Sequence, residues 1–172
     1  MYRELGGVLA ECPLRVGHWD IEVGDVAIEL DEEQHFNRYR ALTLESTCYG
    51  EMPAFPLANY RLYCERYESK CPAFGKFWSS PSTIDQFGPA SRLGDLKAPG
   101  APRWKQRAFY DFLKDLAPEM VGTRVARVSI WDTVTVGSAS VLLGDILDGR
   151  FKYDAAPAVV ALIESRAGGR LN

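Results

Sequence analysis

Five polar side chains with the capacity for metal or acid–base chemistry lie within one stretch, HWDIEVGDVAIELDEEQHFNRYR, residues 18–40. They are Asp20, Glu29, Asp31, Gln34 and His35. Carboxylate oxygens are ligands that Mg²⁺ prefers, and a bound divalent cation can activate water. An amide or an imidazole close behind can orient that water or carry a proton. The residue types therefore predict a divalent-cation site with supporting polar groups.

The first two carboxylates are expected to meet across a β-hairpin. Residues 18–24 and 25–31 each read as a short strand, and Gly24-Asp25 between them is suited to a tight turn. Asp20 then lies near the start of one strand and Glu29 near the end of its antiparallel neighbour. Asp31 shares a strand face with Glu29, because side chains two positions apart point the same way. The hairpin therefore predicts that Asp20 and Glu29 lie side by side.

An ordinary structural role is the alternative for each of these residues taken alone. Asp20 can cap a turn, and Glu29 and Asp31 can be solvated on the outer face of an edge strand. The sequence DEEQ can be a polar loop, and His35 a surface histidine. The presence of all five groups around an otherwise apolar hairpin favours the functional interpretation.

Further elements follow from periodicity and from breaker residues. We expect helices over residues 2–11, 56–71 and 102–118, and strands over 12–17 and 123–131. The tail is expected to form short helices over 138–150 and 156–166. Residues 72–101 are rich in Pro, Gly and Ser and predict an irregular insertion, with aromatic anchors at Phe74, Phe77, Trp78 and Phe87.

Composition predicts one soluble domain in the cytoplasm. The chain has 172 residues, of which 47% are hydrophobic and 25% charged, which is ordinary for a globular protein. The net charge of −3 gives no global attraction to nucleic acid or to an anionic membrane, so such a partner needs a local basic face. The four cysteines match no zinc-ligand spacing, and we expect free thiols. Apolar residues in the insertion, about 41–101, and in the extension, about 133–172, leave room for a homodimer interface or a protein partner.

The stretch WDIEVGDVAIELDEEQHF resembles the core of the PD-(D/E)XK, or restriction-endonuclease-like, nuclease superfamily, and most closely its branch of very-short-patch repair endonucleases. The resemblance covers residues 1–40 and 102–132. It implies an α/β (α+β) fold with an αβββαβ core, a mixed central sheet and flanking helices. It also implies that Asp20, Glu29 and Asp31 hold Mg²⁺ or Mn²⁺, with Gln34 and His35 as the trailing catalytic amide and imidazole.

The chain departs from the superfamily's pattern at two positions. Asp31 stands in place of the usual lysine, and Glu32 stands where relatives tend to have glycine. In some members the lysine lies on the second core helix, and by that analogy Lys105 is the catalytic candidate. An acidic residue on the first helix sometimes assists, and Glu4 is at that place, although a helix-surface charge is the simpler interpretation.

Two functions from different classes are consistent with this pattern. The first is a metal-dependent nuclease that hydrolyses DNA phosphodiester bonds. The second is a catalytically degenerate member of the fold that acts as a nucleic-acid- or protein-binding module; the missing lysine and the acidic pI favour it, and a plain scaffold is a third alternative. A cationic rim would contact the DNA phosphates in the first case. Its expected members are Arg38, Arg40, Arg103, Lys105 and Arg107.

Overall fold

The computed structural model describes residues 1–14, 17–71, 78–151 and 153–171. Contacts divide the chain into two compact units. Unit 1 comprises Met1–Gly17, Glu33–Glu51 and Leu57–Leu116. Unit 2 comprises His18–Glu32, Met52–Pro56 and Ala117–Asn172. Each unit has its own hydrophobic core, and we describe each by itself.

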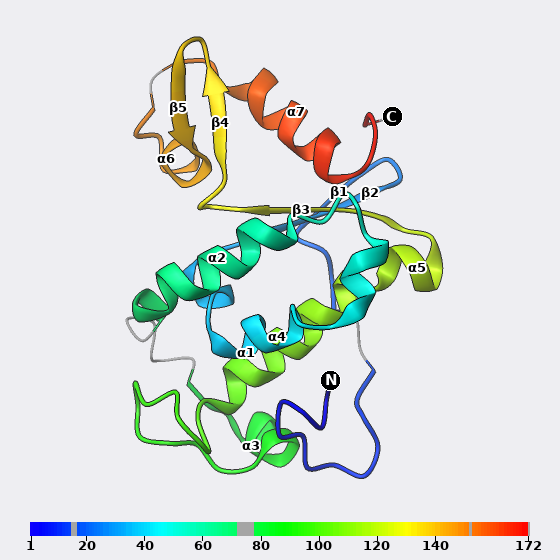
Figure 1. The fold of residues 1–172 in the computed structure, drawn as a ribbon, viewed down its shortest axis with the longest axis vertical. Helices are drawn as coiled ribbons and strands as arrows, with labels where there is room; N and C mark the ends of the chain where they lie inside the picture. The colour runs from blue at the N-terminus through cyan, green and yellow to red at the C-terminus, as the bar shows by residue number, and fades with distance from the viewer. Residues whose placement is uncertain (15–16, 72–77, 152, 172) are drawn as a thin grey trace. The chain divides into compact units, whose positions relative to one another are not determined.

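Unit 2 is built around a small mixed sheet, shown in Figure 1. Strands β1 (Ile21–Val23) and β2 (Val26–Asp31) form an antiparallel hairpin. Strand β3 (Arg124–Ser129) then pairs with β2 in parallel. A second hairpin consists of β4 (Thr133–Val136) and β5 (Ala139–Leu142). The helices of this unit are α5 (Ala117–Val121), α6 (Leu143–Leu147) and α7 (Ala156–Arg166).

One face of the β2–β3 pair forms the core of unit 2. Val26 and Ile28 of β2 and Ala126 and Val128 of β3 are buried together, with Leu143 and Ala167 in the same cluster. Apolar side chains of α7 pack against this cluster, and Figure 1 shows α7 beside the sheet. Because side chains alternate along a strand, the residues between these positions face the opposite side of the sheet. That opposite face carries Ala27, Glu29 and Asp31 of β2.

Unit 1 is helical. Its elements are the 3₁₀ turns η1 (Glu33–His35) and η2 (Thr47–Glu51) and the helices α1 (Arg38–Thr43), α2 (Leu57–Tyr67), α3 (Pro81–Phe87) and α4 (Pro102–Asp115). Helix α4 contacts α1, α3 and η1. It begins with Pro102 in its first turn, where proline's missing N–H costs no hydrogen bond. Helix α4 is therefore the element around which unit 1 is packed.

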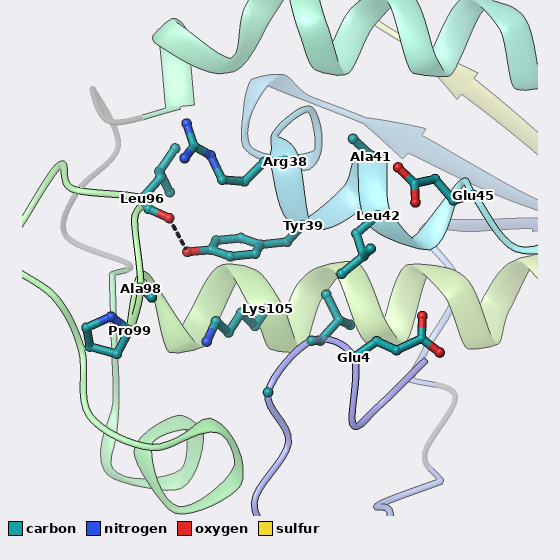
Figure 2. Close-up of a pocket in the computed structure, with 12 residues that line it drawn as sticks. Glu4, Arg38, Tyr39, Ala41, Leu42, Glu45, Leu96, Ala98, Pro99 and Lys105 are labelled. Carbon is teal, nitrogen blue, oxygen red and sulfur yellow. Dashed lines mark hydrogen bonds between the residues drawn. The ribbon is translucent and has the colours of Figure 1, made fainter.

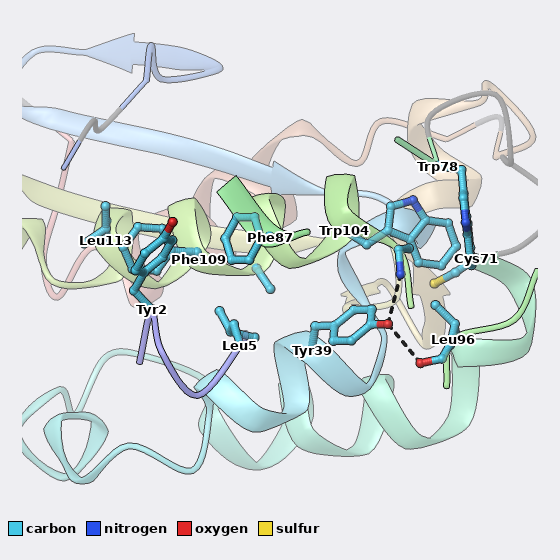
Figure 3. Close-up of a cluster of buried hydrophobic side chains, with 12 residues drawn as sticks. Tyr2, Leu5, Tyr39, Cys71, Trp78, Phe87, Leu96, Trp104, Phe109 and Leu113 are labelled. Atoms are coloured by element: carbon cyan, nitrogen blue, oxygen red, sulfur yellow. Dashed lines mark hydrogen bonds between the residues drawn. The ribbon is translucent and has the colours of Figure 1, made fainter. Parts of the chain in front are cut away.

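The core of unit 1 is aromatic, as Figure 3 shows. Trp104 of α4 has no exposed surface, and its ring lies edge-on to that of Trp78 at 5.1 Å between centroids. Tyr2 packs against Phe87 and Phe109 at 5.3 and 5.2 Å. The predicted anchors Trp78 and Phe87 are confirmed as core residues, whereas Phe74 and Phe77 lie outside the described residues.

Much of the expected element order is confirmed, and the chain has a mixed α and β fold with a small mixed sheet. The hairpin of residues 18–31 forms as β1 and β2, with Gly24 at a φ of +58° in the turn. The strand expected over 123–131 forms as β3, and the helices expected over 56–71 and 102–118 form as α2 and α4. Hydrophobic spacing was sufficient for these elements because each buries one face.

The helix expected over residues 2–11 is wrong. Residues 2–6 form turns, and Gly6 adopts a φ of +86°, which is incompatible with a right-handed helix. Gly7 lies against the ring of Tyr2, so close that a Cβ there would be 2.4 Å from a ring carbon. The two glycines therefore fold the N-terminal segment into a compact turn. The strand expected over 12–17 is absent at residues 12–14, and residues 15–16 lie outside the described part of the chain.

Two further elements differ from the expectation. The insertion of residues 72–101 contains α3, whose N-terminus is capped by Ser80 and Thr83 in a reciprocal pair of hydrogen bonds. In the tail, residues 139–142 form β5 rather than part of a helix, and the helix expected over 138–150 shortens to α6. The helix expected over 156–166 is confirmed as α7. Gly137, with a φ of +62°, provides the turn between β4 and β5. Alternation of Thr and Val before this glycine favours the hairpin over a helix.

Candidate functional site

Asp20 and Glu29 lie opposite one another at the open end of the β1–β2 hairpin. Ile21 pairs with Ile28, so the antiparallel register places Asp20 opposite Glu29 one residue beyond the ladder. The Asp20 backbone N–H donates to Glu29 Oε1 at 3.3 Å, and Asp20 Oδ2 accepts a hydrogen bond from the Leu30 backbone N–H at 2.9 Å. The predicted convergence of these two residues across the hairpin is present.

The two carboxylates differ in their access to solvent. Asp20 is exposed, whereas Glu29 is only 3% exposed. Within the described part of the chain, the second oxygen of Asp20, Oδ1, accepts no hydrogen bond. Asp20 thus presents an oxygen toward solvent beside a buried carboxylate, which is an arrangement that a cation can approach from outside.

Arg127 joins Glu29 to Asp31 on the same face of the sheet. The parallel register pairs Glu29 with Arg127. From there the guanidinium reaches Asp31, with Nη1 at 3.2 Å from both carboxylate oxygens, while Nη2 lies 3.6 Å from Glu29 Oε2. Arg127 is 2% exposed and Asp31 is fully buried. A buried carboxylate needs a cationic partner, and Arg127 fills that role for both acidic side chains.

The carboxylates of Asp20, Glu29 and Asp31 lie in this part of the sheet together with the guanidinium of Arg127. Carboxylate oxygen is a suitable ligand for Mg²⁺ or Mn²⁺. Asp20 is the carboxylate of this group that is exposed to solvent.

Gln34 and His35 belong to unit 1, where helix α4 holds them. His35 Nδ1 lies 2.8 Å from Asp111 Oδ2, and Arg107 Nη1 donates to Gln34 Oε1 at 2.6 Å. Arg107 and Asp111 are one helical turn apart, so their side chains lie on one face of α4. A carboxylate bonded to one ring nitrogen fixes the orientation of an imidazole. Asp111 therefore orients the His35 ring.

The arginines expected in a cationic rim have different environments. Arg38 is exposed and bonds through Nε and Nη2 to Glu68 at 2.8 and 2.7 Å. Arg40 is fully buried and bonds to Asp115 at 2.7 Å, so its guanidinium belongs to the core of unit 1 rather than to a surface. Arg103 is exposed and donates to Gln106 of its own helix. Exposed phosphate-binding candidates are thus Arg38 and Arg103, with Arg107 half-buried.

Lys105 lines a pocket of unit 1 together with Glu4. The pocket is lined by residues of unit 1, and Asp20, Glu29 and Asp31 are not among them. Burial lowers the pKa of the Lys105 ammonium below its ordinary value. Lys105 therefore belongs to a pocket of unit 1, which Figure 2 shows, and the three hairpin carboxylates do not line that pocket.

Residues 1–149 match a protein family described as a family of unknown function, DUF7255. The chain belongs to DUF7255. The match spans both units up to the end of α6, so the hairpin carboxylates and the Lys105 pocket are both within the DUF7255 region. No curated protein and no solved structure matches the chain significantly.

Two further findings on this DUF7255 chain concern its cysteines and its helices. Cys12, Cys48, Cys64 and Cys71 are free thiols, as expected. No helix in the described ranges is both long and apolar enough to cross a membrane.

Two site residues of this DUF7255 chain were not anticipated from the sequence. Arg127 was recognised only as one position of an alternating strand, and Asp111 only as part of a helix. The parallel pairing of β2 with β3 makes Arg127 the partner of Glu29. An arginine in the interior of a β-branched strand is a signal for such a partner, because a buried cation requires a carboxylate nearby.

Proposed function

We propose that this chain is a metal-dependent nuclease in which Asp20 and Glu29, supported by Asp31, hold Mg²⁺ or Mn²⁺ and direct the hydrolysis of a DNA phosphodiester bond. The observation that carries the proposal is the cross-strand placement of Asp20 and Glu29, with the Asp20 N–H 3.3 Å from the Glu29 carboxylate. The exposed Asp20 carboxylate beside it supports the proposal, because carboxylate oxygen is a suitable ligand for Mg²⁺ and Mn²⁺.

The arrangement of elements supports a restriction-endonuclease-like core as part of the same proposal. A hairpin bearing the carboxylates is followed by helix α4 and then by a strand parallel to the second hairpin strand. This order corresponds to the ββαβ part of the αβββαβ core that the sequence resemblance implies. The N-terminal helix and the first strand of that core have no counterpart among residues 2–6 and 12–14.

Each protein group has a defined part in the proposed chemistry. A divalent cation, when bound, supplies a Lewis acid that lowers the pKa of water and neutralises charge on the phosphodiester. Asp20 offers the exposed carboxylate, and Glu29 the buried one. Arg127 orients Glu29 and Asp31 through its two terminal nitrogens and prevents their mutual repulsion. Exposed Arg38 and Arg103 are suited to contacts with the phosphate backbone.

A nicking assay tests the proposal directly. The full chain is incubated with supercoiled plasmid DNA and Mg²⁺ or Mn²⁺, beside Asp20→Asn and Glu22→Gln. Glu22 is an exposed carboxylate on the same hairpin and is opposite Ala27, so its loss controls for charge. We expect nicking by the chain and by Glu22→Gln, and loss of nicking in Asp20→Asn. Nicking that Asp20→Asn retains, or no nicking with either metal, would contradict the proposal.

The ion pairs of Arg127 favour a second candidate, a nucleic-acid-binding module without catalysis. A guanidinium within 3.6 Å of Glu29 and 3.2 Å of Asp31 already neutralises part of the carboxylate charge, so the sheet can be stable with no metal. Fluorescence anisotropy of a labelled DNA duplex, with and without Mn²⁺, separates the two functions. Binding that is equal with and without metal and unchanged in Asp20→Asn, in a chain that does not nick DNA, would identify the module.

A further inference from the structure

A pocket of about 550 Å³ lies in unit 1 beside α1 and α4. Volumes of this size are typical of sites for small organic molecules. Figure 2 shows Tyr39 and Leu42 of α1 on one side, Lys105 of α4 on the other, and Pro99 near the end of the pocket. Leu5 and Gly6 of the N-terminal turn complete that part of the wall. The pocket is therefore formed by segments distant in sequence but within one unit.

Lys105 provides the cation of this pocket. Its ammonium nitrogen lies 5.7 Å from the centroid of the Tyr39 ring, within the range of a cation–π interaction. Among the residues that the structure describes, no carboxylate forms an ion pair with Lys105. Arg38 also lines the pocket, but its guanidinium is bonded to Glu68. Lys105 is thus a half-buried positive charge with no carboxylate ion-paired to it among the described residues of unit 1.

The backbone around Lys105 is shaped to accommodate it. A Cβ at Gly6 would lie 3.2 Å from Lys105 Nζ, so the absence of a side chain at Gly6 leaves the ammonium its space. Tyr39 is fixed by its hydroxyl, which donates to the Leu96 carbonyl at 2.9 Å and accepts from the Ala101 N–H at 3.1 Å. The Tyr39 ring is therefore held in place before any ligand binds, which lowers the entropic cost of binding.

The two ends of the pocket carry opposite charges. Figure 2 shows Lys105 and Arg38 toward one end and the carboxylates of Glu4 and Glu45 toward the other. Between them, Leu42 and Tyr39 provide apolar and aromatic surface. The Glu4 carboxylate is paired with the Met1 ammonium at 3.1 Å. A ligand with one anionic end and an apolar body matches this pattern, whereas a second anionic group would meet Glu45.

We propose that this pocket binds a small organic monocarboxylate, with the carboxylate paired to the Lys105 ammonium and the apolar body against Tyr39 and Leu42. The reduced pKa of Lys105 is consistent with a site that is partly desolvated before binding. An incoming carboxylate favours the charged form of the ammonium. This site is distinct from the proposed metal ligands and does not require nuclease activity.

Three probes of similar length test the proposal by NMR. The full ¹⁵N-labelled chain is titrated with hexanoate, with 1-hexanol as the neutral match, and with adipate as the dicarboxylate. We expect hexanoate to shift the backbone signals of Gly6, Tyr39 and Lys105 with saturation in the millimolar range. Weaker binding is expected for 1-hexanol and for adipate. Equal binding of 1-hexanol, or no shift with hexanoate, would overturn the proposal.

A substitution of the lysine gives the second arm. Lys105→Met keeps the length of the side chain and removes its charge, and we expect it to weaken hexanoate binding about tenfold, the value of one charge-assisted hydrogen bond. Lys70→Met removes an exposed lysine of the same unit outside the pocket lining and should leave binding unchanged. Unchanged binding in Lys105→Met would overturn the proposal.

Chemical protection of the unsubstituted chain keeps the proposal testable should Lys105→Met not fold. Acetic anhydride acetylates deprotonated amines, and the extent at each lysine is measured by mass spectrometry. We expect hexanoate to slow acetylation of Lys105 and to leave Lys70 unaffected, while 1-hexanol at the same concentration protects neither. Equal acetylation of Lys105 with and without hexanoate would overturn the proposal.

Discussion

Arg40 and Asp115 form an ion pair with both side chains fully withdrawn from solvent. Arg40 Nη2 lies 2.7 Å from Asp115 Oδ2, and the side-chain exposure of each is 0%. Arg40 Nη1 also donates to Thr43 and Tyr49, both at 3.2 Å. The pair connects α1 to the last turn of α4. A basic residue that the sequence suggested for a DNA-binding rim thus has a structural role in the core of unit 1.

Removing one partner of this pair should destabilise the protein strongly. Arg40→Met leaves the Asp115 carboxylate buried without its cation, and we expect a loss of about 3–5 kcal/mol in the free energy of unfolding. Arg92→Met, at an exposed arginine of the same unit, should cost far less. Urea unfolding monitored by circular dichroism measures both. Combining Arg40→Met with Asp115→Leu should cost less than the sum of the single changes, because no charge is then left unpaired.

Gly100 is predicted to be a position where alanine is not tolerated. A Cβ at Gly100 would lie 1.8 Å from the Tyr39 hydroxyl oxygen, and the φ of +80° already disfavours any side chain. Gly94 has a similar φ of +87° but nothing within 4 Å of a Cβ, so it isolates the backbone cost. We expect Gly94→Ala to lose about 1–2 kcal/mol and Gly100→Ala to lose clearly more. Thermal unfolding of the two variants gives the comparison.

A second substitution separates the steric contribution from the backbone contribution. Tyr39→Phe removes the hydroxyl that an alanine at residue 100 would meet. In the Gly100→Ala background it should recover part of the lost stability, although the Tyr39 ring carbon would still lie 2.9 Å from the new Cβ. Equal melting temperatures for Gly94→Ala and Gly100→Ala would contradict the close approach of Tyr39 to this turn.

The hairpin that brings Asp20 opposite Glu29 could be predicted from the sequence because its information is local. Gly24 adopts the positive φ that the tight turn requires, and the turn fixes which residues face one another. Alternation along residues 25–31 then decides which side chains share a face. Nine positions separate the two carboxylates, and every residue between them belongs to the same hairpin.

The environment of Glu29 could not be predicted in the same way. Arg127 meets Asp31 across a separation of 96 residues, through a parallel pairing that no turn fixes. The same applies to Lys105, whose surroundings depend on Gly6 and Tyr39 far away in sequence. Helix-like spacing in residues 2–11 was misleading because a positive φ at Gly6 is not visible in a hydrophobic pattern. Local patterns thus identified elements and neighbours within a hairpin, whereas long-range pairing decided the chemistry of the side chains.

Stability should depend on pH through Glu68. Its hydrogen bonds to Arg38 lower the pKa of the Glu68 carboxyl below the ordinary value of 4.5. A depressed folded-state pKa adds stability above the unfolded-state pKa, and this contribution is lost as pH falls through the folded-state value. At neutral pH we expect Glu68→Gln to lose up to about 1 kcal/mol, since the pair is partly exposed.

The pH series gives that prediction its control. The stability difference between the chain and Glu68→Gln should shrink as the pH falls from 4.5 through the lowered folded-state pKa of Glu68, because below that pKa both chains carry a neutral side chain at residue 68. Glu65→Gln, at an exposed carboxylate in the neighbouring helix α2, is the matched control variant. A difference for Glu68→Gln that stays constant from neutral to acid pH would contradict a charge-dependent bond to Arg38.

We predict that the Cys71 thiol reacts with alkylating reagents more slowly than the half-buried thiols of Cys12 and Cys48. It is fully buried, and its Sγ donates to the carbonyls of Glu33 and Phe36 at 3.0 and 3.1 Å. Burial raises the pKa of the Cys71 thiol to about 12. At pH 8 only about one molecule in ten thousand then carries the thiolate, which is the nucleophilic form.

Iodoacetamide should therefore alkylate half-buried Cys12 and Cys48 of the native chain while Cys71 stays unmodified, as read by peptide mass spectrometry. In urea all four cysteines should react at similar rates, which shows that the native structure and not the local sequence protects Cys71. Alkylation of Cys71 as fast as that of Cys48 in the native chain would mean that the carbonyls of Glu33 and Phe36 do not enclose this thiol.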